Sequence, residues 1–201
     1  MPFIVPMFGN ATGDRAGSTG LAGRLAPGID LDNGNIALGA NISAYFPFGA
    51  ITTKVSAGFE AGLPPYNAST LFVSVSGMAP ICRGGALTLF GYAYAHADLS
   101  ITIEEWTALA RPRSTPRLVN SFICNPIQIF DVTATVLGVP TATLDNSPFS
   151  CAFSMPIRPD RYYVCWINVS QSATCQGVVY AEGDSNVVFE FPNVFFDFTN
   201  P

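Results

Sequence analysis

Apolar and polar residues alternate with a period of two along several segments of this chain, and this pattern constrains the fold more than any other feature. Leu71, Val73 and Val75 alternate with serines, so an extended segment there has one apolar and one polar face. The same alternation puts further residues on apolar faces: Leu99, Ile101, Ile103, Phe130, Val132, Ala134, Val136, Tyr163, Cys165, Ile167, Val169, Val187, Phe189 and Phe191. The pattern predicts half-buried β-strands.

Proline, glycine and asparagine separate about nine such segments at a spacing of roughly ten residues, which is typical of an all-β antiparallel β-sandwich. Residues 71–76 and 86–103 are expected to pair as a hairpin, with residues 77–85 as the turn. Residues 104–110 begin with two glutamates and precede Pro112, so they are the one segment predicted to form a short helix.

The 201 residues are expected to form one domain with an N-terminal extension. Residues 9–28 are rich in Gly, Ala, Thr and Ser without any period, so residues 1–29 are interpreted as an extended arm or loop. Residues 30–201 then form the sandwich, with a division into two half-domains conceivable at the Pro-rich connector 111–117. No apolar run approaches the length of a membrane span of about 18 residues.

Charged residues are scarce, at 11% of the chain, and the net charge is −5. These values argue against strong, delocalised binding of nucleic acid. Arg111, Arg113 and Arg117 are the one basic cluster, and they could make a weak contact with nucleic acid phosphates or with an acidic partner. A solvated linker is the alternative interpretation of this cluster.

The residues that usually carry catalysis are few. His96 is the single histidine, and Asp98 lies two residues on, on the same strand face, but no nucleophile turn such as G-x-S-x-G accompanies them. The cysteines have no C-x-x-C spacing and are five in number, which predicts buried thiols, with one or two disulfides in an oxidising environment. We therefore expect no enzyme activity, no catalytic or metal site and no cofactor.

Trp106 and Trp166 have two interpretations. Aromatic rings can stack on the apolar face of a sugar, so the two tryptophans are candidate ligand-stacking residues. Large aromatic residues also fill protein cores and subunit interfaces, and packing is the alternative.

Two segments resemble picornavirus-like jelly-roll capsid proteins. In residues 67–103 a strand of the type L-x-V-x-V leads through a loop to an aromatic and Ala-rich strand that ends in Asp98-Leu99. Residues 185–195 are similar to a strand that is followed by proline and aromatic residues in the same family. The resemblance implies a jelly-roll shell subunit whose work is assembly, and it carries over no catalytic residue.

The function predicted from the sequence is therefore structural. A chain with 49% hydrophobic residues and little charge is expected to bury β-sandwich surfaces against copies of itself or related shell subunits. The protein would then be a viral capsid or capsid-associated subunit, located in the virion. The alternative is an extracellular or cell-surface binding module, similar to a trimeric lectin, with a carbohydrate ligand.

Overall fold

A computed structural model describes residues 15–25, 29–30, 36–62, 64–107, 117–124 and 126–199. The described residues form one antiparallel sheet of nine strands, which confirms the all-β prediction. The strands are β1 (Arg15–Leu25), β2 (Ile29–Asp30), β3 (Ile36–Gly62), β4 (Thr70–Thr107), β5 (Leu118–Ile123), β6 (Ile127–Gly138), β7 (Thr141–Thr143), β8 (Ser147–Pro156) and β9 (Arg161–Thr199). No helix of the described part is long and apolar enough to cross a membrane.

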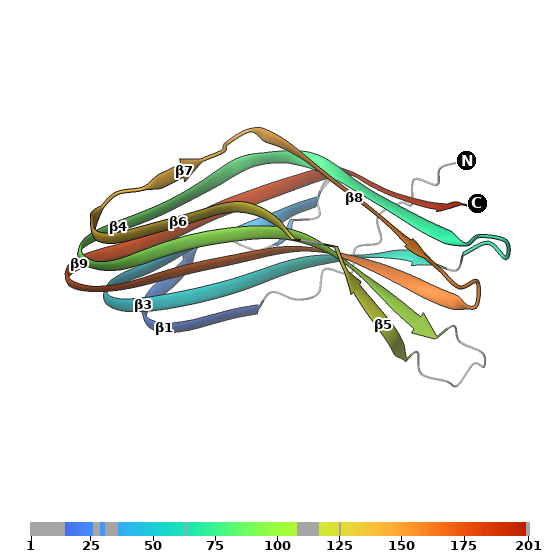
Figure 1. Ribbon diagram of the computed structural model, residues 1–201, viewed down its shortest axis with the longest axis horizontal. Coiled ribbons are helices and arrows are strands. Elements are labelled where there is room, and N and C mark those ends of the chain that lie inside the picture. The colour runs from blue at the N-terminus through green and yellow to red at the C-terminus, as the bar shows by residue number, and fades with distance from the viewer. Residues whose placement is uncertain are drawn as a thin grey trace.

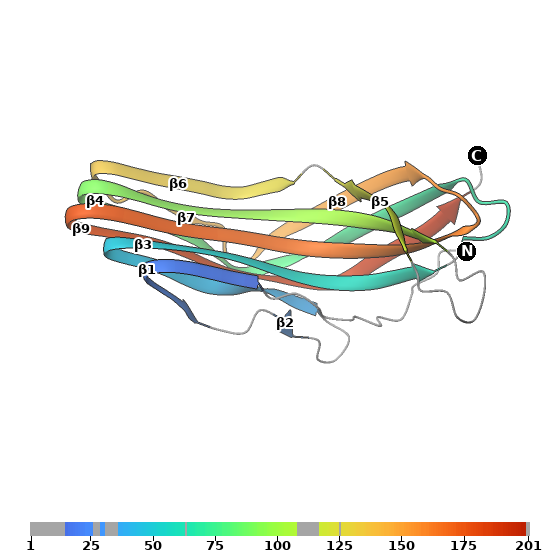
Figure 2. The same cartoon turned by 90° about the horizontal axis from the view of Figure 1, so that it is seen from below.

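The three longest strands, β3, β4 and β9, each reverse direction at the same end of the molecule (Figures 1 and 2). The ladders are irregular at these points, between Tyr45 and Phe48 in β3 and between Leu89 and Gly91 in β4. Phe90 in β4 and Val136 in β6 have positive φ angles of 58° and 65°, which turn the chain there. We call residues 45–48, 89–92, 136–139 and 177–180 the bend edge.

The bends fold the sheet over into two layers. Layer A contains, in order, residues 36–45 of β3, the second half of β9, residues 70–89 of β4, and then β7 and β8. Layer B contains residues 48–62 of β3, the first half of β9, residues 92–107 of β4, and then β6 and β5. Each long strand thus contributes one half to each layer, and this matched strand order in two packed layers is that of a jelly roll.

The core lies between the layers and consists of every second residue of each strand. Val73, Ile101 and Ile167 are at most 1% exposed, as the alternation predicts. Gln171 is a buried polar exception that crosses from layer B to layer A. Its Nε2 donates hydrogen bonds to the Ala40 carbonyl at 2.9 Å and to the Ser185 hydroxyl at 2.9 Å. The predicted strand faces are therefore largely right, although Val136 is 59% exposed because it lies on the bend edge.

The predicted hairpin of residues 71–76 and 86–103 is wrong, because both segments belong to the continuous strand β4. Gly77 and Pro80 lie at irregularities of the ladder with β9 and do not form a turn. Strand β9 pairs along one edge of β4, while β8 and β7 pair along the other, so the chain stays extended between them. The same strand reverses later, at Phe90.

The predicted helix at 104–110 is also wrong over its described part, because β4 extends to Thr107. Pairing with β5 and β9 places Glu104 and Glu105 on opposite faces of the strand. The rest of that prediction, residues 108–110, lies outside the described residues.

Residues 15–25, predicted as part of an arm or loop, form strand β1, which pairs with β3 along ten register positions. The prediction is therefore wrong for this segment, because backbone pairing with a neighbouring strand needs no hydrophobic alternation. Residues 1–14 and 26–28 of the predicted arm lie outside the described part. Strands β3 and β4 precede the connector 111–117 in the sequence, and both pair with β9, which follows it.

Candidate functional site

The basic cluster predicted from the sequence is described at one residue. Arg117 is exposed, and its backbone N–H donates a hydrogen bond to the Thr107 hydroxyl at 3.0 Å. Arg111 and Arg113 lie outside the described residues. A contact of this cluster with nucleic acid or an acidic partner therefore stays a prediction.

The two candidate stacking residues, Trp106 and Trp166, both lie on the outer face of layer B and are half-buried. Trp106 faces Tyr162 in the ladder, whereas Trp166 faces Thr102, so the two rings belong to different rungs four positions apart. The Trp106 indole donates a hydrogen bond to Glu104 Oε2 at 3.1 Å. The Trp166 ring lies over Gly58, where any side chain would collide with it. Trp166 thus packs against the sheet.

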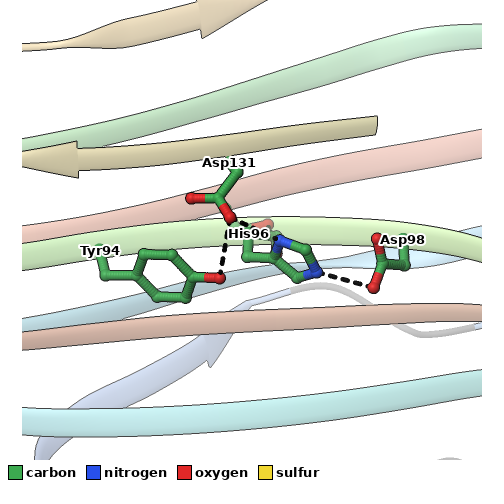
Figure 3. A network of polar contacts seen from close by, with 5 residues as sticks. Tyr94, His96, Asp98 and Asp131 are labelled. Atoms are coloured by element: carbon green, nitrogen blue, oxygen red, sulfur yellow. Dashed lines mark hydrogen bonds and ion pairs between the residues drawn. The ribbon is translucent and has the colours of Figure 1, made fainter. Parts of the chain in front are cut away.

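A polar cluster on the outer face of layer B surrounds the single histidine (Figure 3). His96 Nε2 lies 2.7 Å from Asp98 Oδ2, as expected for neighbours on one strand face. Asp131 of β6 faces His96 in the ladder, and its Oδ2 is 3.7 Å from His96 Nδ1. The Tyr94 and His96 rings stack with centroids 5.9 Å apart. Asp131 joins this cluster through strand pairing. Tyr94 joins it by stacking on His96, and its hydroxyl group donates a hydrogen bond to Asp131 Oδ2 at 3.5 Å.

This cluster holds an imidazole between two carboxylates. General acid–base catalysis at such a ring would need a reacting group within hydrogen-bond reach. In the described residues, however, His96 Nδ1 has no hydrogen-bond partner. The ring nitrogens of His96 face carboxylates, and no protein nucleophile in the described part of the chain hydrogen-bonds to them.

Three of the cysteine thiols are less acidic than a free thiol. Burial raises the pKa of Cys82 and of Cys151 to about 11, and it raises the pKa of the fully buried Cys165 as well. Thiolate, the nucleophilic form, is therefore scarce at these positions near neutral pH. Within the described part of the chain, no group of three or more His, Cys, Asp and Glu side chains could hold a metal ion.

The bend edge carries a dense set of exposed apolar side chains. Phe90 is 58% exposed, and Val178 is 82% exposed. Nine further large apolar residues of this edge or next to it are at least 39% exposed: Tyr45, Phe48, Leu89, Tyr92, Val136, Leu137, Val139, Val179 and Tyr180. These residues come from β3, β9, β4 and β6, and Val139 directly follows β6. The four strands are neighbours in this order, so the residues form one continuous surface.

The area of this surface exceeds what an isolated protein usually exposes. An aromatic residue has roughly 200 Å² of surface, so the five aromatics of the edge, each about half exposed, contribute on the order of 450 Å². The six aliphatic residues add a comparable amount. The largest apolar patch of a typical monomer is only about 300–600 Å². The bend edge therefore has the size of an interface.

Sequence reasoning missed the bend edge, although the sequence contains a signal for it. Each of the four segments combines one glycine or proline with three bulky apolar residues: Tyr-Phe-Pro-Phe, Leu-Phe-Gly-Tyr, Val-Leu-Gly-Val and Gly-Val-Val-Tyr. None of these residues is charged. A glycine or proline beside exposed bulky residues is unusual for a turn, which normally uses small polar residues.

The comparisons with known proteins find likeness in structure alone. No known family and no curated protein matches the chain. One similar structure is the enzymatically active domain of tailspike protein 4 of bacteriophage CBA120, with 8% identity and a TM-score of 0.29 over 94% of this chain and 20% of that one. Another is TmCBM61 in complex with β-1,4-galactotriose, with 12% identity and a TM-score of 0.23 over 89% of this chain and 87% of that one. The chain spans one fifth of the tailspike chain.

Proposed function

We propose that this chain is a structural protein that self-assembles through β-sandwich surfaces, as a viral capsid or capsid-associated subunit. The observation that carries the proposal is the continuous apolar surface of the bend edge, where Phe90 and Val178 are more than half exposed. Its area, on the order of 900 Å², matches the roughly 800 Å² that each partner buries in a stable complex.

A second copy of the chain is the partner that this surface fits best. None of the sixteen residues of the bend edge carries a charge, so the edge offers a nucleic acid or a charged protein no ionic contact. Interface cores are poor in charge and rich in aromatic residues, and five of the exposed residues are Tyr or Phe. Self-association would bury the same surface on each copy.

The experiment is light scattering after size-exclusion chromatography, combined with electron microscopy of the same fractions. We expect the wild-type protein to form oligomers or particles at micromolar concentration. Val178→Asp should prevent assembly. Val178 is 82% exposed in the single chain and would be covered by the second copy, so the new carboxylate would become buried at the interface. Tyr66→Asp is the matched control, since Tyr66 is 94% exposed and lies in the loop between β3 and β4, away from the bend edge.

Circular dichroism checks that both variants fold. A wild-type protein that stays monomeric at all concentrations would refute the proposed function. Assembly of Val178→Asp at the wild-type level would refute the bend edge as the contact surface.

The alternative, an extracellular or cell-surface binding module for carbohydrate, is favoured by the His96 cluster. Tyr94 and His96 offer a stacked aromatic surface, and Asp98 and Asp131 add carboxylates that can accept hydrogen bonds from sugar hydroxyls. A glycan array tests this function. Binding that is lost in Tyr94→Ala and retained in Trp166→Ala would place the ligand at the cluster, and the reverse result would place it at the tryptophan.

A further inference from the structure

Two of the five cysteines, Cys124 and Cys151, lie next to each other although 27 positions separate them in the sequence. Their Sγ atoms are 3.9 Å apart. Cys124 follows β5 in layer B, whereas Cys151 belongs to β8 in layer A, so the contact joins the two layers. Both side chains are half-buried against the core.

The backbone holds both residues in place. The Cys124 N–H donates a hydrogen bond to the Ile101 carbonyl at 2.9 Å, which ties it to β4. Cys151 pairs with Val75 in the ladder of β4 and β8. The short separation of the sulfurs therefore follows from the fold itself and not from a chance approach of two loops.

A disulfide bond needs a sulfur separation of about 2.05 Å, so the two sulfurs must move closer by about 1.9 Å in total. Rotation about the Cα–Cβ bonds is the movement that brings the sulfurs together, since each Sγ travels on a circle around that bond. The other cysteines are less accessible: Cys82, Cys165 and Cys175 are at most 1% exposed. An oxidant in solution can thus reach Cys124 and Cys151 more easily than the rest.

We propose that Cys124 and Cys151 form an intramolecular disulfide in the presence of a low-molecular-weight disulfide, and that the bond ties layer A to layer B at the side formed by β5 and β8. The thiolate of one cysteine attacks the oxidant and releases one thiol, and the second cysteine then attacks the mixed disulfide and releases the other. Two protein thiols are oxidised, one small disulfide is reduced to two thiols, and the protons pass to them.

The bond would tie a short, mostly exposed strand to the other layer. Strand β5 has six residues, of which five are exposed, and it pairs with β4 along one edge. A cross-link that closes a loop of this length lowers the entropy of the unfolded chain. The expected effect is a rise in melting temperature on the order of 5–10 °C for a domain of this size.

The test uses the full chain incubated with oxidised glutathione and then digested with trypsin without reduction. Cleavage after Lys and Arg, with the Arg158–Pro159 bond resistant, places Cys124 and Cys151 together in peptide 118–161. Cys82 falls in peptide 55–83, and Cys165 and Cys175 fall in peptide 162–201. We expect peptide 118–161 to be lighter by two hydrogens, and the number of reactive thiols in the denatured protein to fall from five to three.

Three variants complete the experiment. Cys124→Ser and Cys151→Ser should each abolish the mass change and the rise in melting temperature, whereas Cys165→Ala should keep both. Cys165 is the control because it lies close enough to Cys151 for that residue to contribute to its raised pKa, yet it is fully buried. The proposal would be overturned by five reactive thiols after oxidation or by an unchanged melting temperature. It would also be overturned by a disulfide between peptides 118–161 and 162–201 or by one between two chains.

Discussion

Two neighbouring glycines of β4, Gly84 and Gly85, provide a sharp test of the two-layer architecture. A Cβ atom added at Gly84 would lie 2.4 Å from Cε2 of Phe130, which is 5% exposed and belongs to layer B. Gly85 points to the opposite face, and a Cβ atom there would meet nothing within 4 Å. The same substitution to alanine therefore adds a clash at one position and none at the next.

The expected magnitudes follow from this geometry. Since carbon atoms pack at about 3.5–4.0 Å, the Phe130 ring would have to move by about 1 Å, and overpacking of this kind costs about 1–3 kcal/mol. Replacement of glycine by alanine otherwise gains about 0.4–1 kcal/mol, because the unfolded chain loses conformational freedom. Gly85→Ala should therefore be neutral or stabilising, and Gly84→Ala should be less stable than Gly85→Ala by about 1–3 kcal/mol.

Thermal unfolding followed by circular dichroism measures this difference, with all proteins at the same concentration because assembly would shift the transition. About 2–4 °C per kcal/mol is expected for a domain of this size, so the two variants should differ by about 2–12 °C. In a Phe130→Leu background the difference should shrink, since the smaller side chain leaves room for the added methyl group. Equal melting temperatures of the two variants, or an unchanged difference in that background, would refute the packing of β4 on β6 across the core.

Three further predictions concern the core and the outer face of layer A. Val73→Asp should prevent folding, because an unpaired carboxylate at a fully buried site costs several kcal/mol of a total of about 5–15; soluble, folded protein by circular dichroism would contradict the assigned face. Gln171→Leu should cost about 2–4 kcal/mol in urea unfolding, because the Ala40 and Ser185 acceptors in layer A lose their donor; an unchanged midpoint would contradict the bridge. Burial raises the pKa of Asp184, so its protonated carboxyl group favours the folded state below the unfolded pKa near 3.8, and this contribution is lost as the pH rises through the folded pKa. Asp184→Asn should therefore raise the melting temperature at pH 7 but not at pH 3. Equal effects at the two pH values would be inconsistent with a raised pKa.

The sequence was sufficient for the fold class and for most of the core. Period-two alternation depends on the geometry of a single strand, so Leu71, Val73 and Val75 could be assigned to the buried face without knowledge of their partners. The same argument placed His96 and Asp98 side by side. It could not find Asp131, which reaches His96 through a ladder between strands more than thirty positions apart.

Strand ends and bends were the errors, and they share one physical cause. Gly77 and Pro80 have the composition of a turn, and residues 104–107 begin like a helix, yet both lie inside β4 because strands on both of its edges hold the backbone extended. Phe90 has no turn signal of its own and still adopts a positive φ of 58°, because β3, β4, β6 and β9 bend together there.

The sequence by itself therefore determined which side chains face inward, since alternation is a local property of the chain. The tertiary structure decided where each strand bends, which halves stack, and which residues from distant segments meet. Those outcomes depend on the pairing of whole strands, whose many backbone hydrogen bonds outweigh the preference of any single turn residue. The apolar bend edge and the contact between Cys124 and Cys151 both arise at this level.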